Sequence, residues 1–376
     1  MSTRSLDAVV LAAGEGTRMR SVRPKPLHLL CGRPMVVHVL DALAEIAVRR
    51  VVVVVGHGAD RVAKQVSAHA PSDLAIEYVE QHVQRGTGAA MSVALTGFGD
   101  VEDDDESDGD VVVLPGDAPL VRPPTLAALV RFHRQSDAAA TVLTAVVEDP
   151  TGYGRIVRGK DDRVLRIVDE DVAVADERDI REINTAIYCF RRSVLAPALR
   201  RLSPENAHGE YYLSDVIEVL VDAGYRTVGL VAPDPIEAAG VNDRAQLAMA
   251  EAELRDRTNE RWMRRGVTMV DPEHTYIDTS VQLGMDVTLF PGTVLRGATV
   301  IGDGAEIGPN AHLVDTVVGD RAVVEASVAR HASIGTDARV GPFASLEPGA
   351  SVADGTVTGP FFQAPGPLGA APASQS

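Results

Sequence analysis

The sequence predicts two differently built parts, an α/β domain with a Rossmann-like, mostly parallel sheet and, after it, a short left-handed parallel β-helix. Three observations support this prediction. The 376 residues exceed the length of one typical domain. Up to about residue 233, short β-branched runs alternate with helix-like segments, which is typical of a parallel sheet covered on both faces. Beyond residue 288, apolar residues recur every six positions, as in hexapeptide β-helices.

The elements of the α/β part follow from this alternation. The expected strands are continuous apolar runs, so both faces of the sheet should be buried. The helices should connect strands that run in the same direction. The expected strands are 7–11, 51–55, 77–79, 111–114 and 141–147, and the expected helices are 35–47, 59–69, 88–96 and 124–135.

The second part is predicted from ten apolar anchors, which follow a helix expected over 242–264. Turn pairs such as Gly302-Asp303 and Gly308-Pro309 lie between the anchors. The anchors are Leu289, Leu295, Ile301, Ile307, Leu313, Val328, Ile334, Val340, Leu346 and Val352. We expect the α/β domain over 1–235, a linker helix within 236–275, the β-helix over 276–358 and a disordered tail over 359–376. Phe361 and Phe362 are candidates to cover the last coil.

The charge of the chain argues against large anionic partners. The formal net charge is −17 at pH 7, whereas nucleic acid and anionic membranes bind wide positive surfaces. The acidic run 101–110 is expected to be a solvated loop rather than a metal site, because clustered carboxylates repel one another. Cys31 and Cys189 fit no metal spacing and are expected to be reduced, partly buried thiols. Without a signal-peptide core or a membrane-spanning apolar run, the expected location is the cytoplasm.

One glycine-rich loop concentrates positive charge in this acidic chain. LAAGEGTRMRSVRPKPLH, residues 11–28, follows an apolar strand and should lie at the carboxyl edge of the sheet. Gly14 and Gly16 let the backbone approach an anion, and Arg18 and Lys25 add positive charge. Met19 stands where the dinucleotide fingerprint has its third glycine, and the P-loop ending GK[ST] is absent. The loop therefore predicts a phosphate site of a different class.

The loop and six later segments resemble a known family. LAAGEGTRMRSVRPKPLHLLCGRPM is similar to the pyrophosphorylase signature of sugar nucleotidyltransferases, and its PKPLH ending resembles GlmU-type N-acetylglucosamine-1-phosphate uridyltransferases. The later segments keep the order of that family, and the resemblance covers about residues 5–358. They are QRGTGAA (84–90), LPGDAPL (114–120), DPTGYGRIVR (149–158), EINTAIY (182–188), NAHGEYYLSDV (206–216) and GVNDRAQLA (240–248).

This resemblance implies a reaction and its main residues. UMP would pass from UTP to N-acetylglucosamine 1-phosphate, giving UDP-N-acetylglucosamine and pyrophosphate. Arg18 and Lys25 would be catalytic, because they offset charge on the α-phosphate and on the leaving pyrophosphate. The implied nucleotide-binding residues are Leu11, Ala12, Ala13, Gly14, Gly16, Thr17, Gln81, Gly86 and Thr87.

The resemblance also implies a Mg²⁺ cofactor and a sugar site. Asp117 and Asn242 would bind Mg²⁺ with the help of phosphates and waters; considered alone, they are a turn former and a helix N-cap. Tyr211 and Tyr212 are expected to pack in the core rather than to contact ligand. The implied sugar-binding residues are Gly154, Asp169 and Asn184.

Several positions depart from the family pattern. Asp169 replaces Glu, Ala186 replaces Gly and Ala89 replaces His, so another hexosamine 1-phosphate, or another nucleotide, is the close alternative. In GPFASLEPG, 341–349, Ser345 and Glu347 stand where the family has arginines that meet substrate phosphate. With a shortened β-helix as well, we expect the family's acetyltransferase activity to be absent. The β-helix would then serve assembly, as a homotrimer. A binding subunit without turnover is the third alternative.

Overall fold

The computed structural model describes residues 4–98, 109–206 and 209–366. The chain forms two compact units. The first comprises Met1–His28 and Pro34–Leu247, and the second comprises Leu29–Arg33 and Ala248–Ser376. The division of the chain at a linker helix within 236–275 stays a prediction.

A nine-stranded sheet forms the centre of the first unit. Its strands are β1 Leu6–Ala12, β4 Val51–Val55, β5 Ile76–Glu80, β6 Asp110–Pro115, β7 Ala140–Val146, β8 Arg155–Arg158, β9 Val164–Val168, β10 Glu182–Arg191 and β11 Thr227–Val231. Their order is β11-β7-β10-β6-β1-β4-β5, with β8 paired to β10 and β9. A separate pair is formed by β2 Leu29–Leu30 and β3 Arg33–Pro34.

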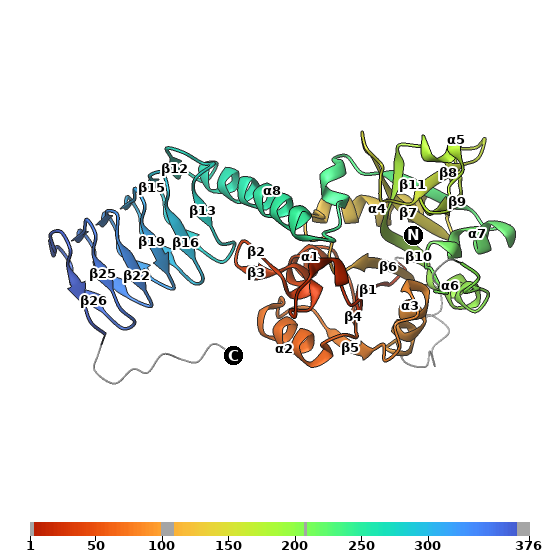
Figure 1. Cartoon of the computed structure of the whole chain (residues 1–376), viewed down its shortest axis with the longest axis horizontal. Coiled ribbons are helices and arrows are strands. Elements are labelled where there is room, and N and C mark those ends of the chain that lie inside the picture. The colour runs from red at the N-terminus through yellow and green to blue at the C-terminus, as the bar shows by residue number, and fades with distance from the viewer. Residues whose placement is uncertain (1–3, 99–108, 207–208, 367–376) are drawn as a thin grey trace. The chain divides into compact units, whose positions relative to one another are not determined.

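Helices cover both faces of this sheet (Figure 1). They are α1 Met35–Ala44, α2 Ala59–His69, α3 Thr87–Thr96, α4 Pro123–Gln135, α5 Ala175–Arg178, α6 Arg192–Leu199 and α7 Asp215–Asp222, with 3₁₀ turns η1 Thr17–Met19, η2 Lys25–Leu27 and η3 Pro235–Ala238. Successive residues of β1 alternate between two cores, Val10 toward α1, α2 and α4 and Val9 toward α3, α6 and α7. The predicted α/β class is therefore confirmed. Across the described ranges, no helix combines the length and apolar character required to cross a membrane.

Within the path β11-β7-β10-β6-β1-β4-β5, β10 runs opposite to the other six strands. β10 is antiparallel to both β6 and β7, whereas β1, β4, β5 and β6 are parallel neighbours. The strands β8, β9, β10 and β11 are not among those that the sequence pattern predicts. Because β10 is antiparallel to its neighbours, its first residues lie at the edge of the sheet where the parallel strands end.

The acidic segment 101–110 was expected to be solvated throughout. Residues 101–108 lie outside the described residues, but Asp110 begins β6 and is fully buried. Its Oδ2 accepts a hydrogen bond from Nε of Arg134 at 2.7 Å, and Nε2 of His133 lies 3.5 Å from Oδ1. The prediction is therefore wrong for Asp110, whose charge is compensated inside the protein.

The second unit begins within the long helix α8, Arg244–Met263, and continues as a parallel β-helix (Figure 1). Short strands stack coil upon coil in three sheets, β12-β15-β18-β21-β24, β13-β16-β19-β22-β25-β27 and β14-β17-β20-β23-β26. Their bounds are β12 Thr268–Met269, β13 Tyr276–Ile277, β14 Gln282–Leu283, β15 Thr288–Leu289, β16 Val294–Arg296, β17 Val300–Ile301, β18 Glu306–Ile307, β19 His312–Val314, β20 Val317–Val318, β21 Val323–Val324, β22 Val328–Arg330, β23 Ser333–Ile334, β24 Arg339–Val340, β25 Ser345–Leu346, β26 Ser351–Val352 and β27 Gln363–Ala364. This confirms the predicted hexapeptide, left-handed β-helix.

The inward anchors agree with the six-residue spacing at all predicted positions except one. Val328 is only half-buried, and Ala329 is the residue of β22 that points into the core. Between Leu313 and Ala329 the inward residues are Val318 and Val324, so two of the steps are five residues long. The prediction for Val328 is therefore wrong, because shorter turns shift the register by one residue.

Aspartates in the turns form hydrogen bonds between neighbouring coils. The carboxylate of Asp303 accepts a hydrogen bond from the backbone N–H of Met285, and Asp320 accepts one from that of Asp303, at 2.8 and 3.0 Å. Each bond satisfies a turn amide that the strands leave unpaired. The predicted tail also contributes structure. Strand β27 pairs with β25 and Phe362 packs against the core, so disorder is wrong for 359–366, while 367–376 lie outside the described residues.

The corrected register predicts different costs for two substitutions. Leu313→Ala should lower the free energy of unfolding of the β-helix by about 3 kcal/mol, since this side chain is fully buried. Val328→Ala should cost less than about 1 kcal/mol. Urea unfolding followed by the fluorescence of Trp262, the single tryptophan, which packs in this core, measures both. Equal losses would contradict the assignment of Ala329 as the inward residue.

Candidate functional site

The glycine-rich loop leaves β1 at the carboxyl edge of the sheet. Its neighbour β6 ends at the same edge, where the N–H of Gly116 donates to the carbonyl oxygen of Leu11 at 2.8 Å. The turn that carries Asp117 therefore lies beside the start of the loop. Arg18, Arg20 and Arg23 are all exposed, but of these only Arg18 lines the cavity described below.

Position 16 favours glycine for two reasons, its backbone conformation and the close contact with Lys25. Its φ is +64°, in the left-handed region, which costs little for glycine alone. A Cβ at Gly16 would lie 2.5 Å from Cβ of Lys25 and 3.2 Å from its Cγ and Cδ. The loop is thus packed against the stem of Lys25. At Gly14, by contrast, a Cβ would meet nothing within 4 Å.

The two predicted catalytic cations contact the two predicted metal ligands. Nζ of Lys25 donates to Oδ1 of Asn242 at 2.9 Å and forms an ion pair with Oδ2 of Asp117. Nη2 of Arg18 donates to the same amide oxygen at 2.9 Å. The N–H of Val241 bonds to the carbonyl oxygen of Asp117 at 2.9 Å, which holds the two ligand-bearing segments together.

The predicted nucleotide loop 84–90 is anchored by the segment that contains Tyr211 and Leu213. Gly86 has a φ of +94°, and a Cβ there would lie 2.5 Å from the carbonyl oxygen of Tyr211. The N–H of Leu213 donates to Oγ1 of Thr87 at 3.0 Å. Gln81, which is buried, donates from Nε2 to the carbonyl oxygen of Gly86 at 3.3 Å. These contacts fix the backbone of the loop.

The predicted sugar residues come from three strands. Gly154 precedes β8, Asp169 follows β9, and Asn184 lies at the start of the antiparallel β10. A Cβ at Gly154 would lie 3.5 Å from Oδ1 of Asp169 and 3.6 Å from Cβ of Asn184. The Asn184 amide is oriented at both ends, since Nδ2 donates to the buried Tyr188 hydroxyl at 2.9 Å and Oδ1 accepts from the N–H of Ala186 at 3.1 Å.

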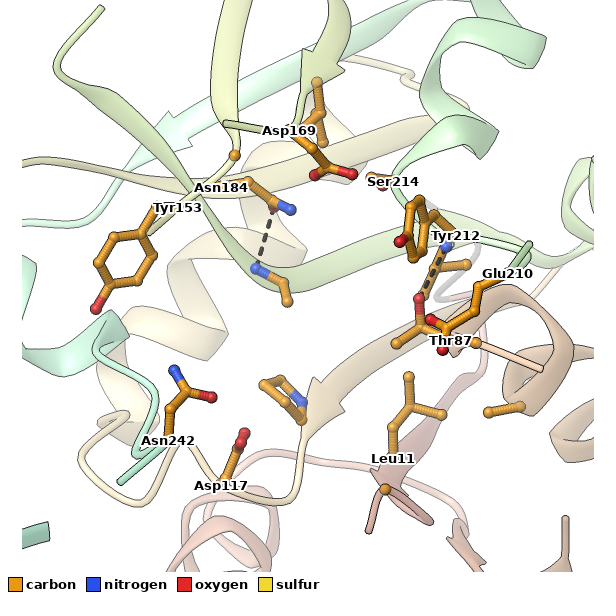
Figure 2. A pocket seen from close by; sticks show the side chains of 18 of the residues that line it. Leu11, Thr87, Asp117, Tyr153, Asp169, Asn184, Glu210, Tyr212, Ser214 and Asn242 are labelled. Atoms are coloured by element: carbon orange, nitrogen blue, oxygen red, sulfur yellow. Dashed lines mark hydrogen bonds between the residues drawn. The ribbon is translucent and has the colours of Figure 1, made fainter. Parts of the chain in front are cut away.

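The predicted site residues line one cavity of about 1180 Å³. Figure 2 shows Asp117 beside Asn242 at one side of it and Asp169 beside Asn184 at another. Every residue for which the sequence predicts a role in the site is among those that line it. They are Leu11, Ala12, Ala13, Gly14, Gly16, Thr17, Arg18, Lys25, Gln81, Gly86, Thr87, Asp117, Gly154, Asp169, Asn184 and Asn242.

Other lining residues were not assigned a role from the sequence. Tyr212 faces the cavity, so the expectation that it packs in the core is wrong, whereas Tyr211 is not among the lining residues. The segment EYYLSD, 210–215, resembles the family, but the spacing of its residues carries no signal for a site. The unassigned polar residues that line the cavity include Tyr153, Glu210, Tyr212, Ser214 and Asp215.

The carboxyl group of Asp215, which lines the cavity, has a raised pKa. Burial, and then the neighbouring carboxylate of Asp169, raise the pKa of Asp215 from 3.8 to about 6. The folded protein therefore binds this proton more tightly than the unfolded chain. The resulting stabilisation is complete below pH 3.8 and is lost as the pH rises through about 6.

We expect Asp215→Asn to be more stable than the unsubstituted chain at neutral pH, because the amide carries no charge to bury. The difference should shrink as the pH falls through about 6 and disappear near 4. Urea unfolding followed by circular dichroism at several pH values measures it. A difference that does not change with pH would contradict the raised pKa.

The donor set at Asp117 and Asn242 fits a hard divalent cation. Both oxygens converge on a single positive charge, the Lys25 ammonium. Carboxylate and amide oxygens are ligands that Mg²⁺ accepts together with phosphates and waters. Over 4–98, 109–206 and 209–366, no group of three or more His, Cys, Asp or Glu side chains is arranged to hold a metal. Asp117 and Asn242 supply two oxygens, so an octahedral ion bound there would need further ligands, such as phosphates or waters.

Comparison with known proteins identifies the family of this chain. The Nucleotidyl transferase family matches residues 7–241. The chain is similar to the Bifunctional protein GlmU of Brevibacillus brevis, with 47% identity over 323 residues that cover 86% of this chain and 68% of the relative. For the Bifunctional protein GlmU of Thermobifida fusca, the identity is 45% over 329 residues, covering 88% and 67%. The chain therefore belongs to the GlmU family of nucleotidyltransferases.

Proposed function

We propose that this nucleotidyltransferase transfers UMP from UTP to N-acetylglucosamine 1-phosphate in a Mg²⁺-dependent reaction. The observation that carries the proposal is that one cavity is lined both by the glycine-rich loop with Arg18 and Lys25 and, elsewhere on its wall, by Asp169 and Asn184. The names of the relatives support the same class of enzyme.

In this reaction, one bond forms and one breaks at the α-phosphorus. An oxygen of the sugar phosphate attacks in line, and pyrophosphate leaves with the electrons of the broken P–O bond. No covalent enzyme intermediate is needed, so positioning and charge compensation are the contributions of the protein. Arg18 and Lys25 would stabilise the negative charge of the phosphates, and the backbone around Gly14 and Gly16 would approach their oxygens.

Asp117 and Asn242 would hold the metal. When bound, Mg²⁺ supplies charge neutralisation at the phosphate oxygens. At the other side, the Asn184 amide, oriented by Tyr188 and Ala186, would contact the sugar. Asp169 would contact a hydroxyl or the acetamido group, with a shorter reach than the glutamate that the family resemblance implies.

The test is a matrix of nucleoside triphosphates and sugar 1-phosphates with Mg²⁺, in which pyrophosphate release is measured. The fastest release should occur with UTP and N-acetylglucosamine 1-phosphate. Faster release with another hexosamine 1-phosphate would favour the alternative substrate that Asp169 suggests. A complete absence of release would refute the catalytic proposal and favour a binding subunit.

We also propose that this chain lacks acetyltransferase activity. Ser345 and Glu347 lie on and beside β25, and the exposed Glu347 carboxylate would repel a sugar phosphate. With acetyl-CoA and glucosamine 1-phosphate, thiol release should stay at background. A clear signal would refute this proposal.

For the β-helix we propose assembly into a homotrimer. Val300 and Val317 are paired neighbours on one of its sheets, 37% and 52% exposed, and form an apolar face that a second copy would cover. Light scattering should give three times the chain mass, and a monomer would refute it. The proposed compartment is the cytoplasm, since Cys31 and Cys189 are both buried free thiols.

A further inference from the structure

The Lys25 ammonium lies between the two oxygens that the metal would share. It donates to Oδ1 of Asn242 at 2.9 Å and pairs with Oδ2 of Asp117. The side chains of Lys25 and Asp117 are only 14% and 21% exposed, so water screens this pair weakly. Arg18 adds a second positive charge on the same Asn242 oxygen, at 2.9 Å.

A metal and the ammonium compete for this position. A Mg²⁺ ion bound to both oxygens would lie about 2 Å from each. It would then be in contact with an ammonium that donates to the same atoms, and the two cations repel each other strongly at that separation. Lys25 must therefore release Asp117 and Asn242 before an ion can bind both of them.

The stem of Lys25 limits how far it moves. Its Cβ, Cγ and Cδ lie against Gly16, at 2.5, 3.2 and 3.2 Å from the position of a Cβ on that glycine. The movable part is thus the end of the side chain, and it is already beside the loop proposed to hold the phosphates. A triphosphate on that loop offers the ammonium several oxygens in place of the Asp117 carboxylate.

We propose that Lys25 closes the metal site of the free protein and that the triphosphate opens it by drawing the ammonium away. Metal and nucleotide then bind with positive cooperativity, and each raises the affinity for the other by the same factor. The inference rests on the proposed function, because it uses the assignment of Asp117 and Asn242 as metal ligands.

The first test is Mn²⁺ binding to the full chain without nucleotide, measured by electron paramagnetic resonance. Lys25→Met should bind Mn²⁺ at least tenfold more tightly than the unsubstituted chain, because the competing charge is gone. Lys64→Met, which removes an exposed lysine, is the matched control and should leave the affinity unchanged. Asp117→Ala combined with Lys25→Met should abolish the gain and so locate the ion.

The outcomes separate this inference from the function on which it rests. Equal, Asp117-dependent Mn²⁺ affinity in Lys25→Met and the unsubstituted chain would overturn the inference and leave the metal site standing. Affinity that does not depend on Asp117 in any variant would overturn both.

A second measurement needs no substitution of Lys25. The chain has three lysines, Lys25, Lys64 and Lys160, so labelling lysine with ¹³C at Cε gives three resonances. Lys64→Met and Lys160→Met assign two of them. Mg²⁺ together with α,β-methylene-UTP should shift the Lys25 resonance, and Mg²⁺ alone should shift it much less. A Lys25 resonance that stays in place while thermal stabilisation shows that the analogue is bound would overturn the inference.

Discussion

Replacing Asp117 by alanine is expected to lower the rate of pyrophosphate release about 1000-fold, the largest effect of any single substitution considered. The change removes the only carboxylate of the proposed metal pair and also the ion-pair partner of Lys25. Both losses act on the charge that develops during nucleotidyl transfer. Steady-state kinetics at saturating UTP and sugar 1-phosphate measure the rate.

The fold should survive this substitution, because Asp117 lies in a turn after β6 and forms no part of the sheet. Circular dichroism and the melting temperature check this. Asp161→Ala, which removes a carboxylate whose side chain is 62% exposed, is the matched control and should retain the full rate. A loss of less than about tenfold in Asp117→Ala would contradict its assigned role.

Gly16→Ala should reduce both stability and activity. The left-handed φ of +64° costs a non-glycine residue about 1–3 kcal/mol, and the new Cβ overlaps the stem of Lys25. Displacing Lys25 by a few tenths of an ångström to 1 Å should lower kcat/KM by about 100-fold. Urea unfolding and initial rates measure the two effects.

Gly14→Ala is the control for the loss of stability expected in Gly16→Ala. Its added Cβ meets nothing within 4 Å, so the free energy of unfolding should change by less than about 0.5 kcal/mol. If both alanines destabilise the chain equally, the loss at Gly16 does not arise from its conformation and its contact with Lys25.

The parts of the site that are local in sequence were predictable. A strand followed by a glycine-rich, basic loop places Gly14, Gly16, Arg18 and Lys25 near a sheet edge on general grounds. The fold class also followed from local patterns, since the continuous apolar run of β4 indicates burial on both faces. Roles for Asn184 and Asn242 came only from the resemblance to a family.

Other features depend on tertiary contacts, which sequence patterns do not encode. The direction of β10 is set by its partners β6 and β7, and a strand of either direction has the same apolar pattern. Burial, and then the carboxylate of Asp169, which is distant in sequence, raise the pKa of Asp215. The inward position of Ala329 depends on turns that are one residue shorter, and an alanine is a weak hydrophobic signal.

The stacked coils of the second unit also determine how its length can change. Each coil places one strand in each of the three sheets, and coils are spaced by about 4.8 Å, the distance between neighbouring strands. Removal or duplication of one whole coil would leave the inward register of the other coils intact, whereas removal of half a coil would place turns where strands must stack. The height of this unit can therefore change in steps of one whole coil, without any change in the residues that line the cavity of the first unit.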